Sequence, residues 1–481
     1  MNRSLPPESL QDLTEQLSIA HAAFQSRYPG ATGKRQPVHS VYGGAHLFRA
    51  NTAQRFGELA FRALDEYAPD FVAFARAVSL PGNERLPDSP ELAAALVKSV
   101  EANPQGARKE NRPAWFAHTV YRRVREKLEH EPVEDYRIDF EDGYGNRSDD
   151  EEDGHAIAAA NEAANAMMLG QLPPFFGIRI KPLSEELRER SIRTLDIFAT
   201  ELATKTNGKL PANFCITLPK VTLTEEVAAI ADLCSRLEFA LQLDPGTFRI
   251  ELMIETPQAI FNQRGEVNLL PLVAAADGRC TAAHFGPYDY TASRGITASH
   301  QRLDHFACDF AREAMQVALA GTGVWLSDGP THILPIPAHR PGKDGAPFSA
   351  RQLEENRHAI HFAWKLHFQN IRRALVNGFY QGWDLHPAQL PARYAAVFSF
   401  FLEGLDAAAE RLRNFIEKAA QATLVGGVFD DAATGQGLLN YFVRAINCRA
   451  VTPEEAQALT GVSLEELRTA SFLKILENRR A

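Results

Sequence analysis

The chain has 481 residues, of which 45% are hydrophobic and 23% charged, and its net charge is −9. This composition is typical of a soluble globular protein, and the negative balance argues against nucleic acid or an anionic membrane as a partner. No apolar run is long enough for a transmembrane helix and the N-terminus has no apolar signal core, so we expect a cytoplasmic protein. The five scattered cysteines lack C-x-x-C spacing and predict neither a zinc site nor a disulfide framework.

Helix-forming segments come first in the chain. The stretch 8–26 is typical of a helix, and the Gly and Pro residues after it end that helix before a first candidate strand at 38–48. An amphipathic helix is predicted at 52–67, because its apolar residues recur with the spacing of a core-facing helix. Three further helical segments precede the second strand, at 69–78, 90–102 and 113–129.

From the second strand onwards, apolar runs rich in β-prone residues alternate with helical patterns. The eight predicted strands are 38–48, 136–142, 175–182, 213–220, 249–255, 284–290, 323–328 and 382–387. The predicted helices between the later strands are 184–203, 224–243, one ending near 275, 302–320 and 349–377, the last stopped by Gly378 as a C-terminal cap. After residue 390 the chain is predicted to be helical, with breaks near 426 and 449.

Eight strands separated by helices predict an α/β fold, a parallel (β/α)8 TIM barrel. The barrel is expected to span 38–400, with a large helical insertion at 50–130 after the first strand. A helical arm, 1–37, precedes it. A helical extension, 401–481, follows as a lid or an oligomer contact. A doubly wound open sheet is the alternative architecture.

Four charged residues stand at the ends of predicted strands: Arg179, Lys220, Glu255 and Asp289. Each follows apolar residues that a parallel sheet buries, and burying a charge is costly unless the charge is paired or binds a metal. The carboxyl ends of barrel strands meet at one mouth, where TIM barrels place their chemistry. We therefore expect these four side chains to lie close together.

The second strand adds three acids to the same mouth, Asp139, Glu141 and Asp142. Five acids follow at 149–153, in a segment that is typical of a solvated loop and a helix N-terminus, where negative charge suits the helix dipole. Only the first three acids are therefore candidates for the site.

Our main hypothesis is that Glu255 and Asp289 hold one hard divalent cation. Mg²⁺ prefers oxygen ligands and usually takes one or two carboxylates together with water and substrate, and Mn²⁺ is a possible substitute. Arg179 would grip a substrate carboxylate with two parallel hydrogen bonds. Metal and arginine together would stabilise an enolate or a developing oxyanion. In the adjoining turn, Gly286 could offer a backbone N–H to the same carboxylate, whereas Pro287 has none to give.

The alternative hypothesis is a structural ion-pair network, in which Glu255 and Asp289 neutralise Arg179 and Lys220 without a metal. The residues alone leave both readings open. Other motifs add little: there is no G-x-G-x-x-G, P-loop or G-x-S-x-G, which disfavours nucleotide binding and serine hydrolysis. The histidines on the helix 349–377 (His358, His361 and His367) are interpreted as surface or hydrogen-bonded positions.

Six short blocks, in this order, resemble the signatures of the citrate lyase beta-subunit-like, or HpcH–HpaI aldolase, superfamily. The blocks are Ile138-Asp-Phe-Glu-Asp142-Gly, Ile178-Arg179-Ile-Lys-Pro, Leu218-Pro-Lys220, Ile254-Glu255-Thr, Phe285-Gly-Pro-Tyr-Asp289 and Leu385-His386-Pro-Ala-Gln389. The resemblance covers about 38–400 and implies a TIM barrel of the phosphoenolpyruvate/pyruvate type. It also implies a Mg²⁺-dependent enzyme that makes or breaks C–C bonds through an enolate.

The resemblance also implies roles for individual residues. Glu255 and Asp289 match the two metal ligands, and Arg179 matches the arginine that binds the substrate carboxylate. The acidic block matches Glu141 and Asp142, and we take these two, Arg179 and Lys220 as the candidate catalytic residues. In malyl-CoA-type lyases of this group a C-terminal lid lends an acid to a neighbouring subunit, which makes Asp430 or Asp431 a possible lid acid and implies a homo-oligomer.

The sequence departs from the superfamily in its longer first helical region, its larger tail and its opening, where His39-Ser-Val-Tyr-Gly-Gly-Ala replaces the usual R-S-x-L-F-x-P-G block. That block contributes to the coenzyme A side, so use of a CoA thioester stays open. We expect a carbon–carbon lyase or aldolase acting on a small oxo- or hydroxy-acid. The alternatives are a condensing enzyme like malate synthase, a phosphoenolpyruvate-type phosphotransferase, and a non-catalytic scaffold.

Overall fold

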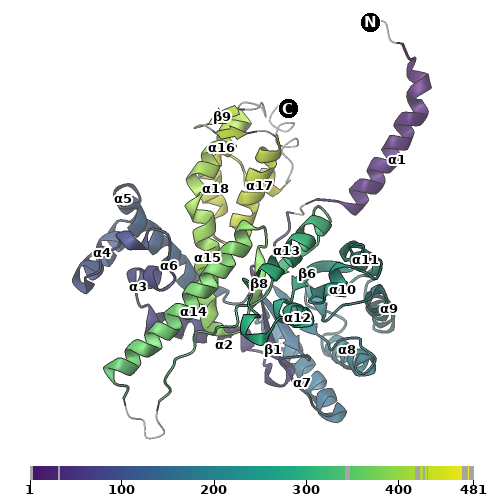
Figure 1. The fold of residues 1–481 in the computed structure, drawn as a ribbon, viewed down its shortest axis with the longest axis horizontal. Coiled ribbons are helices and arrows are strands. Elements are labelled where there is room, and N and C mark those ends of the chain that lie inside the picture. Colours follow the sequence, from purple (N-terminus) through teal and green to yellow (C-terminus); the bar gives the residue numbers. More distant parts are fainter. Residues whose placement is uncertain are drawn as a thin grey trace.

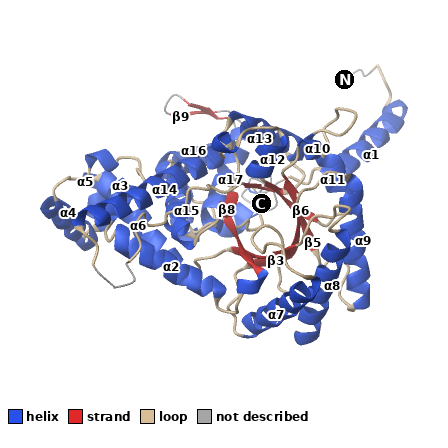
Figure 2. Ribbon diagram, turned by 60° about the horizontal axis from the view of Figure 1, so that its bottom comes forward, coloured by secondary structure: helices blue, strands red, loops and turns tan. Residues whose placement is uncertain are grey.

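The computed structural model describes residues 4–30, 33–341, 347–417, 423–425, 428–430, 432–468 and 475. Eight parallel strands close into a barrel in the order of the sequence, and helices surround the ring of strands (Figure 2). The strands are β1 (His39–Gly44), β2 (Asp135–Asp139), β3 (Phe175–Arg179), β4 (Phe214–Leu218), β5 (Arg249–Ile254), β6 (Cys280–Phe285), β7 (Trp325–Asp328) and β8 (Gln381–Asp384). The closed barrel confirms the predicted fold class.

Along the chain, helices precede the first barrel strand, alternate with the strands and follow the last one (Figure 1). Helix α1 (Gln11–Arg27), preceded by the short helix η1 (Pro7–Leu10), projects away from the rest of the chain and buries none of its residues (Figure 1). Between β1 and β2 lie η2 (Ala45–Leu47), α2 (Thr52–Tyr67), α3 (Phe71–Ala77), η3 (Asn83–Arg85), α4 (Pro90–Ala102), α5 (Pro104–Glu110) and α6 (Arg112–His130).

One or more helices follow each of the strands from β2 to β8. They are α7 (Asp149–Met168), α8 (Arg188–Lys205), α9 (Thr224–Ala240), α10 (Pro257–Ile260), α11 (Leu269–Ala275), α12 (Pro287–Ser293), η4 (Ala298–His300), α13 (Phe306–Leu319), α14 (Ala350–Val376), η5 (Pro387–Gln389) and α15 (Leu390–Glu403). The chain continues through α16 (Leu405–Glu417), a small hairpin of β9 (Thr423–Val425) and β10 (Val428–Asp430), α17 (Ala432–Asn447), α18 (Pro453–Thr460) and α19 (Leu464–Arg468). Every helix among the described residues is too short or too polar to cross a membrane.

The sixth strand is displaced from its predicted position. It ends at Phe285, and the following residues form helix α12, so Asp289 lies in the first turn of a helix and not at the end of a strand. Pro287 explains the difference, because proline has no N–H for a sheet and its fixed φ suits the first turn of a helix. The long helix predicted after residue 390 is likewise two helices, α15 and α16, separated at Gly404. The predicted cap Gly378 does have a left-handed backbone, with φ of 80°.

The inside of the barrel is polar below the mouth. Arg137 of β2 donates two hydrogen bonds of 2.9 Å to Asp135 on the same strand. Glu251 of β5 accepts from the hydroxyls of Thr217 at 2.8 Å and Tyr42 at 3.0 Å. TIM barrels usually fill this space with branched apolar side chains, so hydrogen bonds and ion pairs replace much of the usual apolar packing here.

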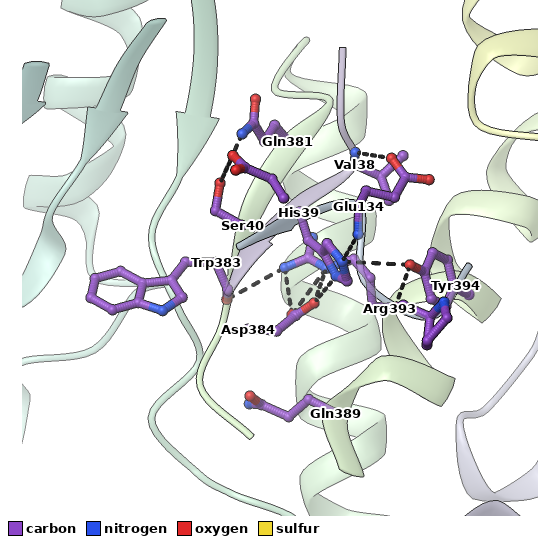
Figure 3. Close-up of polar contacts among 12 residues, drawn as sticks. Val38, His39, Ser40, Glu134, Gln381, Trp383, Asp384, Gln389, Arg393 and Tyr394 are labelled. Carbon is purple, nitrogen blue, oxygen red and sulfur yellow. Dashed lines mark hydrogen bonds and ion pairs between the residues drawn. The ribbon is translucent and has the colours of Figure 1, made fainter. Parts of the chain in front are cut away.

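A second buried polar network lies outside the strands, where β1 and β8 meet helices α14 and α15 (Figure 3). Asp384 accepts from Arg393 at 2.8 and 3.0 Å, from His39 Nδ1 at 2.7 Å and from His367 Nε2 at 2.8 Å. The backbone N–H of Glu134 donates to His39 Nε2 at 3.0 Å, which places the His39 proton on Nδ1. Burial by itself raises the pKa of Asp384, but Arg393 and the two histidines outweigh burial and hold that pKa well below its usual range. His367 is thus hydrogen-bonded, as predicted.

A third cluster joins the segment before β1, helix α6 and the turn after α17. Glu131 accepts from Arg35 Nη1 at 3.2 Å, from Lys127 Nζ at 2.5 Å and from Arg449 Nη2 at 3.0 Å. Burial tends to raise the pKa of Glu131, but the hydrogen bond from Arg35 and the charge of Lys127 outweigh burial and lower the pKa from 4.5 to about 2. Three regions far apart in sequence therefore depend on one ionised carboxylate.

Glu131→Gln is expected to lower the free energy of unfolding by about 1–2 kcal/mol at pH 7, a value discounted for solvent screening. A carboxyl whose pKa is depressed in the folded state stabilises the fold above its unfolded pKa. That contribution is lost as the pH falls through the folded pKa, so the variant and the wild type should converge between pH 4.5 and about 2. Urea unfolding across this range measures the difference, with exposed Glu129→Gln on the same helix as the control. A difference that does not change with pH would assign the effect to packing.

Candidate active site

The mouth of the barrel gathers seven charged side chains. They come from the end of β2 and the turn after it, the end of β3, the residues just after β4 and β5, and the first turn of α12: Asp139, Glu141, Asp142, Arg179, Lys220, Glu255 and Asp289. The candidate catalytic and metal-binding residues are all in this set. The structure therefore brings together the residues that the strand-end argument selected.

Arg179 is the deepest of the cations. Its Nε lies 2.7 Å from Asp139 Oδ1 and its Nη2 lies 2.5 Å from Asp139 Oδ2, a two-pronged ion pair. Its Nη1 lies 2.9 Å from Glu141 Oε2, and the whole residue is 1% exposed. Burial tends to lower its pKa, but Asp139 and Glu141 raise it, so the guanidinium stays charged. Asp139 and Glu141 together therefore pair with all three guanidinium nitrogens of Arg179.

Lys220 has a strained backbone and a central ammonium. Its φ of 52° lies in the left-handed region, which costs a residue with a long side chain on the order of 1–3 kcal/mol. This conformation aims its N–H at Glu255 Oε1, 2.6 Å away. Its Nζ contacts Glu141 Oε1 and lies 3.5 Å from both Asp142 Oδ1 and Asp289 Oδ2. Burial tends to lower the pKa of Lys220, but the Glu141 hydrogen bond and the surrounding carboxylates raise it, so the side chain is an ammonium and no base.

Glu255 is buried beside the backbone of the next strand. A Cβ at Gly286 would overlap its carboxylate, which explains the glycine after the β6 run. Burial and then the negative charge of Asp289 raise the pKa of Glu255 to about 8. Glu255 therefore lies close enough to Asp289 for the two carboxylates to repel each other, which is the arrangement that a shared cation relieves.

The charges at the mouth do not balance. Five carboxylates face two cations, Arg179 and Lys220, and ionising all five would leave an excess of three negative charges. The pKa of about 8 keeps Glu255 mostly protonated at neutral pH, which lowers the excess by one until a cation binds. Among the described residues, no three His, Cys, Asp or Glu side chains group closely enough to bind a metal without other ligands. Glu255 and Asp289 fit the alternative, a Mg²⁺ ion held by two carboxylates and completed by water and substrate.

Other predicted residues have different positions. The N–H of Gly286 donates to the carbonyl of Ile254 at 3.1 Å in the β5–β6 ladder, so it is already used within the protein. Pro287 is the first residue of α12 and is buried. Of the possible lid acids, Asp431 lies outside the described residues, as does the side chain of Asp430 in β10.

Three aromatic residues under the mouth were not singled out from the sequence. The Arg179 guanidinium lies 5.0 Å from the ring centre of Tyr42 and 5.3 Å from that of Trp383. His284 of β6 packs against both rings, at 6.1 and 5.6 Å. Burial and the charge of Arg179 lower the pKa of His284 to about 3, so it is neutral. The sequence did contain a signal for two of them. Side chains two positions apart on a strand point to the same face, and Tyr42 and His284 each lie two residues before the glycine at the mouth end of the strand.

The family profile described as "Domain of unknown function (DUF6986)" matches residues 17–475, nearly the whole chain. The chain belongs to the DUF6986 family. The match covers the barrel, the insertion after β1 and the C-terminal helices, so these parts form one family unit. No curated protein sequence matches this DUF6986 member.

Several solved structures share the barrel. A citrate lyase from Burkholderia xenovorans LB400 is 19% identical, with a TM-score of 0.51 over 70% of this chain and 91% of that one. The CitE protein of Mycobacterium tuberculosis, in complex with magnesium, acetoacetate and coenzyme A, is 15% identical, with a TM-score of 0.42 over 69% and 95%. A malate synthase from Haloferax volcanii is 16% identical, with a TM-score of 0.38 over 70% and 89%. The citrate lyase confirms the resemblance at the level of the fold.

Proposed function

We propose that the protein is a Mg²⁺-dependent carbon–carbon lyase of the aldolase type, acting through an enolate on a small oxo- or hydroxy-acid. The observation that supports it best is the pair Glu255 and Asp289 at the barrel mouth. Burial and the charge of Asp289 make ionisation of Glu255 unfavourable without a cation, within a cluster where acids outnumber the cations Arg179 and Lys220. A divalent cation, when bound there, supplies positive charge that stabilises the oxyanion of the breaking bond. The resemblance to citrate lyase-like barrels and the Mg²⁺ in the CitE complex agree with this assignment.

The remaining residues have roles that follow from their protonation and exposure. Lys220, with a side chain that is 32% exposed, presents a permanent ammonium that can hold a substrate carboxylate. Burial raises the pKa of Glu141, which makes it the candidate base for a substrate hydroxyl. Arg179 fixes Asp139 and Glu141 beneath the substrate and takes the substrate carboxylate only where Glu141 moves aside.

A screen of oxo-acids, hydroxy-acids and their CoA thioesters with Mg²⁺, followed by product mass, tests the proposal. We expect at least one C–C cleavage product, which disappears with a chelator and returns with Mg²⁺ or Mn²⁺. Mass also separates cleavage from condensation, because a condensing enzyme combines the two reactant masses. Failure of every acid class, together with no binding of Mn²⁺, would support the scaffold alternative.

Lys220→Met is expected to tighten metal binding by several-fold while reducing turnover. The ammonium near Asp289, Glu141 and Asp142 repels a second cation, and removing it deepens the negative potential at the mouth. Titration with Mn²⁺, followed by its paramagnetic resonance signal, measures this without a substrate. Lys205→Met on the surface of α8 is the matched control. Weaker Mn²⁺ binding in Lys220→Met would place the cation away from Asp289.

A further inference from the structure

A cavity of about 240 Å³ lies at the opposite end of the barrel from the charged mouth. Its walls come from the amino-terminal ends of the strands β1, β7 and β8, from the segment before β1 and from helix α17. Representative lining residues are Gln36, Trp325, Tyr380, Phe401, Asn440 and Arg444. The barrel, the N-terminal segment and the C-terminal helices thus all contribute to one small cavity that is partly open to solvent.

Arg444 of α17 lines this cavity without a carboxylate partner. Its guanidinium lies 3.8 Å from the ring centre of Tyr380, and its Nη1 donates to the Gln36 side-chain oxygen at 3.3 Å. No ion pair joins it to an acid within the parts of the chain that the structure describes. Burial lowers its pKa. The buried Arg393 differs, because Asp384 neutralises it.

The charge of the cavity is opposite to that of the whole protein. Its described lining contains two basic residues, Lys34 and Arg444, several side-chain amides and no Asp or Glu, in a chain with a net charge of −9. Apolar and aromatic walls, with Trp325 and Phe401 among them, complete the space. The Arg444 guanidinium is half-buried, and removing it from water is costly unless an anion or strong hydrogen-bond acceptors surround it.

We propose that this cavity is a binding site for a small oxyanion, a carboxylate or phosphate group, held by Arg444. Arginine binds both groups with two parallel hydrogen bonds, and Tyr380 keeps the plane of the guanidinium fixed. The apolar walls favour an anion with a short apolar body. Because the cavity lies at the starts of β7 and β8 and the charged mouth at their ends, this anion site is distinct from the candidate active site. The inference does not depend on the proposed reaction.

Fluorescence titration tests the proposal, because Trp325 lines the cavity. The probes are inorganic phosphate and benzoate, each added to the full-length protein without divalent cation and at constant ionic strength. We expect saturable fluorescence change with at least one probe, lost in Trp325→Phe. Arg444→Gln should weaken that binding by at least about tenfold. The matched control is Arg236→Gln, which removes an exposed arginine of α9 and should leave binding unchanged.

The two probes separate the possible ligands: saturation by phosphate alone indicates a phosphate ester, and saturation by benzoate indicates an organic acid. Asn440→Asp provides a second variant if Arg444→Gln does not fold, since a negative charge in the lining should weaken binding several-fold. Absence of saturation with both probes, or equal binding in the wild type and the cavity variants, overturns the proposal.

Discussion

Asp289→Asn is expected to abolish turnover while leaving the barrel folded. The side chain is 41% exposed and lies in the first turn of α12, so an amide of the same shape disturbs no core packing. The change removes one of the two charges proposed to hold the cation. It also removes the smaller of the two causes, after burial, that raise the pKa of Glu255. We expect a loss in kcat/KM of at least about 10³-fold, roughly 4 kcal/mol of transition-state stabilisation.

Two measurements separate a metal ligand from a merely acidic neighbour. Mn²⁺ titration should show weaker binding in Asp289→Asn, and the thermal unfolding midpoint should stay within a few degrees of the wild type. The control is Asp304→Asn, which changes a partly exposed acid that pairs with Arg302 beyond α12. This control should alter neither Mn²⁺ binding nor the unfolding midpoint. Wild-type turnover or unaltered Mn²⁺ binding in Asp289→Asn would show that the metal assignment is wrong.

The position of the site could be predicted from the sequence, but its internal pairing could not. An apolar run followed by a charge marks the end of a strand, and eight such runs require all ends to meet at one mouth. This argument selected Arg179, Lys220 and Glu255 from local pattern alone. The pairing of these side chains depends on the geometry of the barrel, and that geometry cannot be read from the spacing of the residues in the sequence. The choice of Asp139 as the partner of Arg179 follows only from the β2–β3 register, where the two residues lie side by side.

The two hypotheses drawn from the sequence, ion-pair network and metal site, describe different parts of the same cluster. Arg179 forms a buried ion-pair network, but with Asp139 and Glu141 and not with the Glu255 and Asp289 that the ion-pair hypothesis named. Glu255 and Asp289 share only Lys220 as a nearby cation, and the raised pKa of Glu255 shows that Lys220 does not stabilise both carboxylates in their ionised form. The sequence alone cannot tell a carboxylate that is paired from one that is free to bind a metal, because the difference depends on how many cationic side chains contact each carboxylate in the fold. The sequence did contain a local signal that Asp289 lies in a helix and not in a strand. That signal is Pro287, two residues before it.

Asp384→Asn is expected to destabilise the fold by about 3–5 kcal/mol, the largest effect on stability that we predict. Asp384 receives donors from β1, α14 and α15, and all of these side chains are buried. An amide leaves the Arg393 guanidinium buried without a counter-charge. Its NH₂ group also faces the Nδ1–H of His39, which is fixed as a donor by the backbone N–H of Glu134. The closure of the barrel between β1 and β8 should therefore weaken.

A double variant identifies the cause of this loss. If the cost comes from an uncompensated charge, Asp384→Asn combined with Arg393→Met should be more stable than Asp384→Asn alone, because the buried cation is gone. If the cost comes from the lost hydrogen bonds to the histidines, the second substitution should add to the first. Urea unfolding of the wild type, both single variants and the double variant gives the coupling energy. A network built on the Asp384–Arg393 charge pair requires that coupling to be strongly favourable, and an additive result would assign the stability to His39 and His367.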